Sequence, residues 1–161
     1  MSSDPPRLTS DQFRKSAGRF ATGVTVATVV DSSGAPHGLT VNSFTSVSLD
    51  PPLVLVCIDH TAATVESFRT AKHFGINILA DDQRPLSDHF ARKGHNRFEG
   101  LAWHPGKTGV PLLPGVLAVI ECEVHRKIAM GDHDIFVGEV VHSEFHEKAP
   151  LLYYASRYHH L

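Results

Sequence analysis

Apolar and polar residues follow two different periods in the first part of the chain. Thr9 and Gln12 have the spacing of a helix N-terminal capping box, and apolar residues then recur every three or four positions until Gly23. The β-branched run 24–30 stops at an Asp-Ser-Ser-Gly turn, and residues 37–42 supply a return strand. The pattern predicts one amphipathic helix followed by a β-hairpin.

The middle of the chain predicts two strands and two short helices. After an Asp-Pro-Pro break, the apolar run 53–58 is typical of a strand that is buried on both faces. Residues 61–71 have helical spacing, and residues 74–79 form another apolar run. A second short helix is expected over residues 82–91, because a proline lies near its start.

The last part of the chain predicts two long strands after an irregular stretch. Residues 94–115 are rich in glycine and proline, so we expect a long loop that is either functional or a packed excursion. Residues 116–128 alternate as a half-exposed antiparallel strand does, and 135–145 is the last long strand. Six or so strands with few helices predict a mainly β fold, an antiparallel β-barrel with peripheral α-helices.

Length and composition limit the possible functions. A chain of 161 residues suits one domain, with residues 1–8 expected to be a flexible N-terminal tail. The net charge of −2 and the pI near 6.6 argue against a nucleic-acid partner. No apolar run could span a membrane, and the polar start predicts no secretory signal. Cys57 and Cys122 lie in apolar runs, which favours a reducing cytoplasm over a disulfide framework.

Two common kinds of catalytic site are not expected. The chain has 12 histidines, but no His-x-x-x-His helix face and no Cys-x-x-Cys pair, so we expect no metal site. The serines at positions 43, 46 and 48 lack the Gly-x-Ser-x-Gly elbow of many hydrolases.

Hydroxyl and amide side chains gather in the segment 38–52, just before a proline break. Thr40, Asn42 and Ser43 lie there among apolar residues, and Thr45, Ser46 and Ser48 continue the pattern. A flavin needs an apolar slot for its ring and hydrogen-bond partners along the ring edge. A half-exposed strand would alternate in the same way, so this segment alone leaves both interpretations open.

Two further clusters could bind an anion such as a phosphate. Residues 57–64 end a strand and open a helix, where free backbone N–H groups and threonine hydroxyls favour an anion, although an ordinary N-cap has the same pattern. Residues 90–98 place Arg92, Lys93 and Arg97 around a glycine. Guanidinium and ammonium groups suit phosphate binding, but a solvated basic loop has the same composition.

A histidine occupies a turn that does not need one. Residues 131–139 begin as Gly-Asp-His-Asp, and a hairpin tip requires glycine and aspartate but not His133. An imidazole there could donate a hydrogen bond to a bound cofactor or stack against it.

Taken together and in this order, the four clusters resemble the short-chain flavin reductase family, the reductase components of two-component flavin monooxygenases. The resemblance is carried by FATGVTV at 20–26, TVNSFTS at 40–46, DPPLV at 50–54, FARKG at 90–94, RF at 97–98, GDHDIFVGE at 131–139 and LLYY at 151–154. It implies an FMN-binding split barrel of Greek-key antiparallel topology that forms a homodimer. It also implies that NADH or NADPH reduces FMN or FAD, which then leaves for a partner oxygenase.

The resemblance also implies roles for individual residues. Those expected to line the flavin ring and its ribityl chain are Thr40, Val41, Asn42 and Ser43. Those expected to flank the ribityl chain and phosphate are Cys57, Ile58, Asp59 and Thr64. Those expected at the phosphate end are Arg92 and Lys93, framed by Phe90 and Ala91, with Arg97 as a further candidate. His133 is expected to meet the nicotinamide.

Two positions depart from the family pattern. Members often carry Asn where this chain has Asp59, and Asp where it has Asn96. An ionised carboxylate repels a phosphate, so we expect the backbone of Asp59 rather than its side chain to face that end of the cofactor.

Two other functions are compatible with a split barrel. The first is an FMN oxidase of the pyridoxamine-phosphate type, although the chain has few basic residues for a second phosphate pocket. The second is a flavin-binding module without enzymatic activity. The choices between FMN and FAD and between NADH and NADPH stay open.

Overall fold

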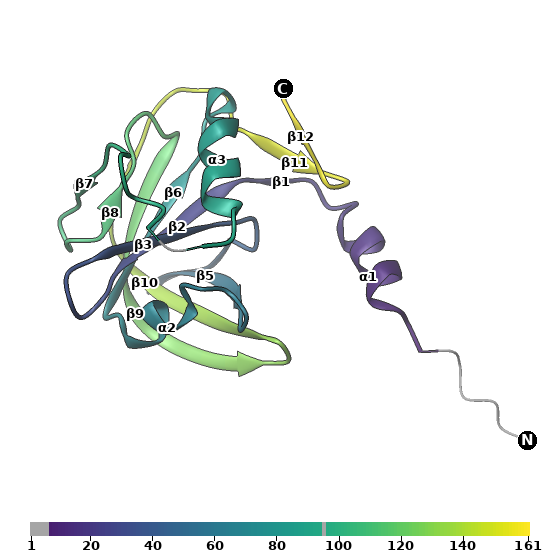
Figure 1. Cartoon of the computed structure of the whole chain (residues 1–161), viewed down its shortest axis with the longest axis horizontal. Coiled ribbons are helices and arrows are strands. Elements are labelled where there is room, and N and C mark those ends of the chain that lie inside the picture. Colours follow the sequence, from purple (N-terminus) through teal and green to yellow (C-terminus); the bar gives the residue numbers. More distant parts are fainter. Residues whose placement is uncertain (1–6, 95) are drawn as a thin grey trace, which may run out of the picture.

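The structure, a computed structural model, describes residues 7–94 and 96–161 and consists mainly of antiparallel β-strands (Figure 1). Most of the expected N-terminal tail therefore lies outside the described residues. In chain order the elements are α1 (Ser10–Ala17), β1 (Thr22–Gly23), β2 (Thr25–Val30), β3 (Pro36–Val41), β4 (Thr45–Leu49), β5 (Pro52–Asp59), α2 (Val65–Thr70), β6 (His73–Ile78), η1 (Asp81–Gln83), α3 (Arg84–Ala91), β7 (His104–Pro105), β8 (Pro111–Leu112), β9 (Ala118–Met130), β10 (His133–Phe145), β11 (Leu152–Tyr154) and β12 (Arg157–His159).

A seven-stranded sheet with the order β3-β2-β6-β9-β10-β5-β4 forms the body of the protein. All its neighbouring strands pair antiparallel. After β5 the chain passes through α2 and continues in β6, which is separated from β5 in the sheet by β9 and β10. The sheet curls until β3 comes near β5, without a hydrogen-bonded closure between its two edge strands. The prediction of a mainly β, split antiparallel barrel is confirmed.

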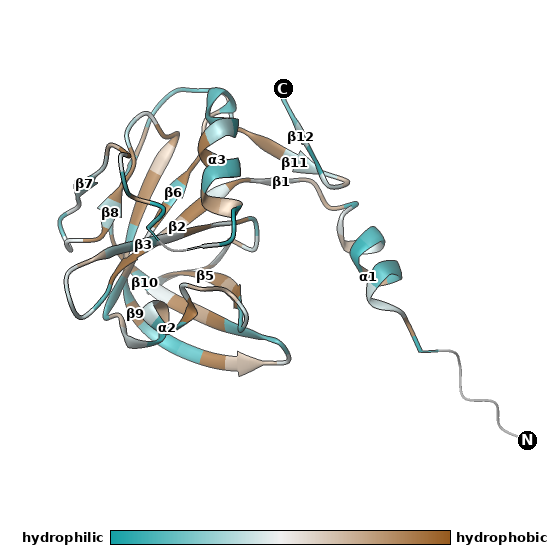
Figure 2. Cartoon of the chain, in the orientation of Figure 1, coloured by the Kyte–Doolittle hydropathy of each residue, from teal (hydrophilic) through white to brown (hydrophobic). Residues whose placement is uncertain are grey.

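The inner face of the curled sheet forms one part of the core. Phe74 of β6 and Phe136 of β10 are completely buried there, and Phe68 of α2 packs against Phe136 with ring centroids 5.6 Å apart. Apolar residues follow the central strands in Figure 2, whereas α1 is mostly hydrophilic. Burial of this apolar surface is the main favourable contribution to folding.

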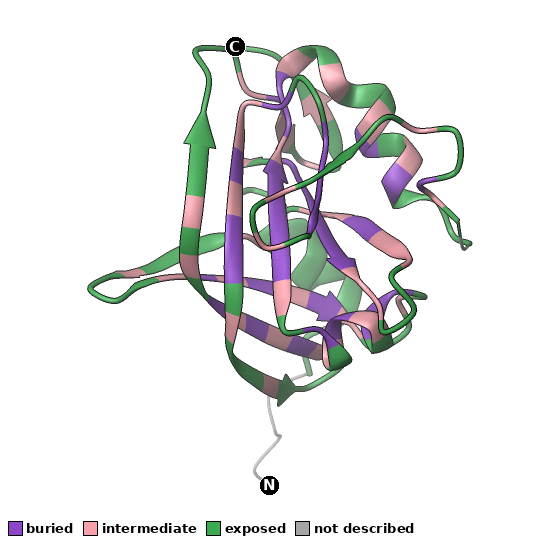
Figure 3. Ribbon diagram, turned by 90° about the vertical axis from the view of Figure 1, so that its left-hand side faces the viewer, coloured by how far each residue is buried: buried purple, intermediate pink, exposed green. Residues whose placement is uncertain are grey.

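Strand β5 differs from its prediction. Its burial alternates along the strand, with Val54, Val56 and Ile58 buried and the residues between them only half-buried, as the striped ribbon of Figure 3 shows. The prediction of a strand buried on both faces was therefore wrong. Apolar residues on both faces gave the appearance of a central strand, although one face of β5 is partly open.

Helix α1 begins as predicted and ends early. The backbone N–H of Gln12 donates to Thr9 Oγ1 at 3.2 Å, and the N–H of Thr9 donates to Gln12 Oε1 at 3.0 Å, which completes the capping box. The helix ends at Ala17, and Gly18 forms its C-cap, so its predicted extension to Gly23 was wrong. None of its residues is buried, and Figure 1 shows it standing away from the barrel.

Several elements were shorter than expected or were missed. The helix predicted over 61–71 extends only over Val65–Thr70, and the long loop 94–115 contains the hairpin β7-β8. Strand β4 and the small sheet β1-β11-β12 were not predicted. The loop is a packed excursion, because the buried Asn77 side chain accepts a hydrogen bond from the backbone N–H of Leu113 at 2.8 Å.

Among the helices of residues 7–94 and 96–161, none combines the length and the apolar character that crossing a lipid bilayer requires.

Candidate functional site

A groove lies between β3, the end of α3 and the C-terminal hairpin β11-β12. It consists of two adjoining cavities of about 190 and 420 Å³, which share Thr40 and Ala91 in their walls. The smaller cavity has Tyr153 and Tyr158 in its wall, and the larger one has Arg92, Lys93 and Arg97 in its wall together with Asp59. Four distant segments of the chain thus form one groove with an aromatic end and a basic end.

Helix α3 lies close against β3, and this contact forms the groove floor. Thr40 Oγ1 donates to the backbone oxygen of Ser87 at 2.6 Å. A Cβ atom at Gly38 would lie 3.1 Å from the Phe90 ring, so the glycine allows the close approach. The last helical residue, Ala91, is followed by Arg92 in extended conformation, which directs the basic segment along the groove.

The aromatic end of the groove is held by the C-terminal hairpin. The rings of Tyr153 and Tyr158 pack at a centroid distance of 5.4 Å, and the Tyr158 hydroxyl lies 2.8 Å from Ser87 Oγ. Val24 and Asn42 complete the wall. An apolar aromatic surface with an amide at its edge suits a flat heteroaromatic ring.

The Ser43 hydroxyl connects the segment after β3 to β5. Its Oγ accepts a hydrogen bond from the Cys57 N–H at 3.0 Å and donates to the Cys57 backbone oxygen at 2.9 Å. Both capacities of the hydroxyl are thus used across the gap between β3 and β5. A direct contact of Ser43 with a cofactor stays a prediction.

A small recess beside the basic end of the groove contains two buried polar atoms that have no hydrogen-bond partner among the described residues. Arg97 donates from Nη1 to the Gly38 backbone oxygen at 2.8 Å, but its Nε has no hydrogen-bond partner among the described residues. Thr64 Oγ1 also has none, although Thr64 is the N-cap of α2, and both residues line one small recess. Arg92 and Lys93 line the larger cavity beside them. Buried donors without partners are unfavourable, so this end is suited to an acceptor-rich anion.

The Asp59 carboxylate is turned towards its own chain. Its Oδ1 accepts hydrogen bonds from the backbone N–H and the hydroxyl of Thr61, both at 2.7 Å. These bonds lower the pKa of Asp59 below its ordinary value, so the group stays ionised. They also explain why α2 begins only at Val65, because residues 61–63 form a turn around this carboxylate. The expectation that its backbone faces a phosphate stays a prediction.

His133 lies at the start of β10, beside the groove rather than in its wall. It is the cross-strand neighbour of Asp59, so the two side chains are on the same face of the sheet. Its Nδ1 lies 2.6 Å from Asp132 Oδ1, and its side chain is 41% exposed. The imidazole is therefore accessible to a ligand that extends past Asp59.

Four predicted residues contribute mainly through their packing. Ile58 and Phe90 are buried in the core, so only their backbones are available to a cofactor. Val41 packs against the core from its rim. Cys57 is half-buried, and burial raises the pKa of its thiol, which makes it a poor nucleophile. Their contacts with a cofactor stay predictions.

The family described as "Flavin reductase like domain" matches residues 17–161. The chain belongs to this family. An NADH-dependent flavin reductase from Rhodococcus sp is 41% identical in an alignment that covers 97% of this chain and 89% of the relative. The reductase component of a flavin-dependent trigonelline monooxygenase from Acinetobacter baylyi is 42% identical over 91% of this chain and 47% of the relative.

Solved structures of the flavin reductase-like family have the same fold. The Streptomyces globisporus NADH:FAD oxidoreductase SgcE6, in complex with NAD and FAD fragments, has a TM-score of 0.87 and 38% identity, covering 92% of this chain and 90% of that one. Other relatives are longer: the chain spans only 42% to 56% of the length of the first curated relatives it matches.

The flavin reductase-like domain presents residues that fit a flavin phosphate. The free Thr64 hydroxyl and Arg97 Nε are donors for phosphate oxygens, and Arg92 and Lys93 add positive charge. Tyr153 and Tyr158 were not predicted as groove residues. The tyrosines near the C-terminus are visible in the sequence, but nothing in the sequence indicated which element their side chains would face.

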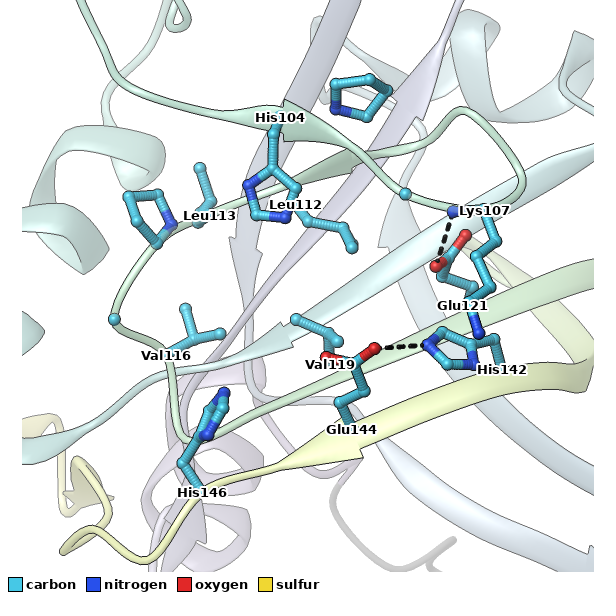
Figure 4. A pocket seen from close by; sticks show the side chains of 14 residues that line it. His104, Lys107, Leu112, Leu113, Val116, Val119, Glu121, His142, Glu144 and His146 are labelled. Carbon is cyan, nitrogen blue, oxygen red and sulfur yellow. Dashed lines mark hydrogen bonds and ion pairs between the residues drawn. The ribbon is translucent and has the colours of Figure 1, made fainter.

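A separate cavity of about 410 Å³ lies under the hairpin β7-β8 of this flavin reductase-like domain (Figure 4). His104, His142 and His146 surround it, and His142 Nε2 lies 2.8 Å from Glu144 Oε1. No three His, Cys, Asp or Glu side chains of residues 7–94 and 96–161 are placed to hold a metal ion. The cavity shares no lining residue with the groove.

The buried Glu121 in this second cavity fixes the tip of β7-β8. Its carboxylate accepts hydrogen bonds from the Lys107 N–H at 3.0 Å, and from the Thr108 N–H and hydroxyl at 2.7 and 2.6 Å. Burial alone would raise the pKa of Glu121, but the bonds from Thr108 and Lys107 outweigh it and lower the pKa. The ionised carboxylate is thus the form that the fold stabilises.

Glu121→Gln should lower the free energy of unfolding at pH 7 by about 2 kcal/mol, because an amide NH2 would face the N–H donors of the hairpin tip. Since the folded-state pKa is lowered, the contribution of Glu121 is fully present above the ordinary value of 4.5 and is lost as the pH falls through the folded pKa. Urea unfolding of both proteins between pH 7 and pH 3 measures this difference. The exposed Glu123→Gln on the same strand is the matched control, and equal losses in the two variants would contradict the role of Glu121.

Proposed function

We propose that this protein is an NAD(P)H:flavin oxidoreductase that transfers a hydride from the nicotinamide to FMN or FAD. The observation that carries this proposal is a pair of buried donors, Thr64 Oγ1 and Arg97 Nε, which have no hydrogen-bond partner among the described residues and line a recess beside the basic end of a groove whose other end is aromatic. This arrangement suits a molecule with a flat ring at one end and a phosphate at the other. Family membership and the names of the relatives support the same activity.

The residues of the groove are proposed to bind and orient rather than to exchange protons. Tyr153, Tyr158 and Thr40 would line the ring, while Thr64 and the basic segment hold the phosphate. A bound flavin supplies the hydride acceptor, its N5 atom, and the nicotinamide C4 is the donor. His133, exposed beside Asp59, would orient the nicotinamide. Correct placement of two reactants can account for a large part of a rate enhancement.

The choice of cofactors follows the relatives. The Rhodococcus relative is named as NADH-dependent, and SgcE6 is named with NAD and FAD fragments, so we propose NADH as the preferred donor. We propose FMN or FAD as the acceptor, since the groove would hold the part that the two flavins share.

We further propose a homodimer that works in the cytoplasm and passes reduced flavin to an oxygenase partner. The partner is supported by the Acinetobacter relative, which is named as a reductase component of a monooxygenase. The cytoplasm is supported by Cys57 and Cys122, which are both free thiols. The homodimer rests on the family resemblance alone.

The decisive experiment is anaerobic mixing of the purified protein with each flavin and each nicotinamide in turn. We expect flavin absorbance near 450 nm, the region in which oxidised flavins absorb, to bleach within seconds when NADH is added. The same four combinations compare FMN with FAD and NADH with NADPH.

The two alternative functions, an oxidase and a binding module, predict different results in this experiment. A pyridoxamine-phosphate oxidase would turn over pyridoxamine phosphate without a nicotinamide. A binding module would quench flavin fluorescence but show no bleaching with either nicotinamide. Either result would contradict the proposed reductase.

A further inference from the structure

A buried carboxylate directly follows His133 and joins three segments of the chain. Asp134 of β10 accepts a hydrogen bond at Oδ2 from Arg69 Nε of α2 at 2.6 Å. Its Oδ1 lies 2.9 Å from Nε2 of His60, which belongs to the turn between β5 and α2. The side chain of Asp134 is almost completely buried, so both of its oxygens depend on these partners.

The contacts of Asp134 also determine the direction of its neighbour. Successive side chains of a strand point to opposite faces, so Asp134 points inward to α2 while His133 points to the face that it shares with Asp59. A rotation of the strand start that moved one side chain would move the other. The backbone N–H of His60 also donates to the Asp132 oxygen at 3.0 Å, which fixes the same turn from the other side.

The imidazole of His133 has little support of its own. Within residues 7–94 and 96–161 its only side-chain partner is Asp132, which lies in the same turn and is 89% exposed. A bond within the turn cannot hold the turn in place relative to the barrel. The direction of the imidazole therefore depends on the residues that fix the start of β10.

We propose that Asp134 is a positioning residue for nicotinamide binding. Clamped by Arg69 and His60, it sets the direction in which His133 meets the hydride donor. This inference rests on the proposed function. The flavin end of the groove has supports outside this turn, the bond from Thr40 to α3 and the bond from Arg97 to the Gly38 backbone oxygen, so loss of the clamp should affect the nicotinamide more than the flavin.

The test is a double-mutant cycle between Asp134→Asn and His133→Ala, with the KM for NADH, kcat and the flavin Kd measured for each protein. We expect Asp134→Asn alone to raise the KM for NADH about tenfold, a coupling of ordinary size between contacting residues, and to change the flavin Kd less than twofold. In the His133→Ala background the same substitution should change the KM less than twofold. A merely structural residue would give the same factor in both backgrounds.

Two further variants test the same role of Asp134 independently, one in its partner Arg69 and one as a control. Arg69→Gln removes one of the two partners of Asp134 and should also raise the KM for NADH. This variant can be measured even if Asp134→Asn folds poorly. Glu66→Gln is the matched control, because Glu66 pairs with Arg69 from the solvent side, is 74% exposed and makes no contact with Asp134. It should leave all three constants within twofold of the wild type.

Equal effects of Asp134→Asn in both backgrounds, or a parallel loss of flavin and NADH affinity, would overturn the positioning role while the reductase activity stood. An unchanged KM in His133→Ala would overturn the role of His133 and this inference with it. Absence of NADH-dependent flavin reduction by the wild-type protein would instead contradict the proposed function itself.

Discussion

Replacing Gly138 with alanine is expected to lower the free energy of unfolding by about 3 kcal/mol, the upper part of the range for an overfilled core. A Cβ atom at this position would lie 2.5 Å from Cys122 Cβ and 2.5 Å from Phe74 Cζ, where van der Waals contact needs more than 3 Å. Cys122 on the adjacent strand β9 and Phe74 on β6, one strand further along the sheet, are both completely buried and cannot move aside. Thermal unfolding should show a decrease in Tm of about 6–12 °C for a protein of this size.

Two matched variants check the cause of this destabilisation. Gly23→Ala adds the same methyl group where nothing lies within 4 Å, so its Tm should stay within about 1 °C of the wild type. Shortening the neighbour in the double variant Gly138→Ala with Phe74→Leu should restore part of the loss, because the two positions are in contact. Additive losses in the double variant would show that the clash with Phe74 is not the reason.

Replacing Arg97 with glutamine is expected to weaken FMN binding about 30- to 100-fold, as the loss of a buried charge-assisted hydrogen bond does. The guanidinium is anchored to the Gly38 backbone by Nη1, lines the larger cavity and keeps Nε without a partner among the described residues, so it has a donor to offer to an anion. Quenching of flavin fluorescence in a titration measures the Kd.

Riboflavin is the matched ligand, because it lacks the phosphate. Its affinity should be the same for the wild type and Arg97→Gln within about twofold. Arg14→Gln on α1, which removes the same charge from a residue that lines neither cavity of the groove, should leave both affinities unchanged. If riboflavin and FMN lost affinity equally, Arg97 would act on the fold or on the ring and not on the phosphate.

The sequence predicted correctly those helices and strands that are stabilised mainly by contacts between residues close together in the chain. The capping box of α1, the hairpin of β2 and β3, and the two long strands β9 and β10 were expected at nearly their observed positions. A side chain that caps a helix or a turn that joins two strands acts over a few residues, so the sequence contains the whole signal.

Elements that depend on distant partners could not be predicted. Strands β7 and β8 have two residues each, and they exist because Glu121, Asn77 and their neighbours hold the loop from outside. The two-residue strand β1 exists through its pairing with β11, more than a hundred residues later in the chain. Such strands have no period of their own to detect.

The candidate site was only partly predictable for the same reason. The residues Thr40, Arg92 and Arg97 were found from their chemistry, and the structure brings them to one groove. The tyrosines of β11 and β12 were missed, since pairing of the C-terminal hairpin with β1 decides which face they present. Ser43 shows the opposite case, because its hydroxyl joins β5 instead of pointing freely into the groove.

The assembly of the groove from four distant segments links occupancy to folding. A ligand that contacts β3, the turn after β5, the segment after α3 and the C-terminal hairpin can bind only when all of them are in place. Such a ligand stabilises the native state by RT ln(1 + [L]/Kd), about 2.7 kcal/mol at a hundredfold excess over Kd. If the protein binds flavin as proposed, free flavin in excess of its Kd would therefore raise the free energy of unfolding of the whole domain.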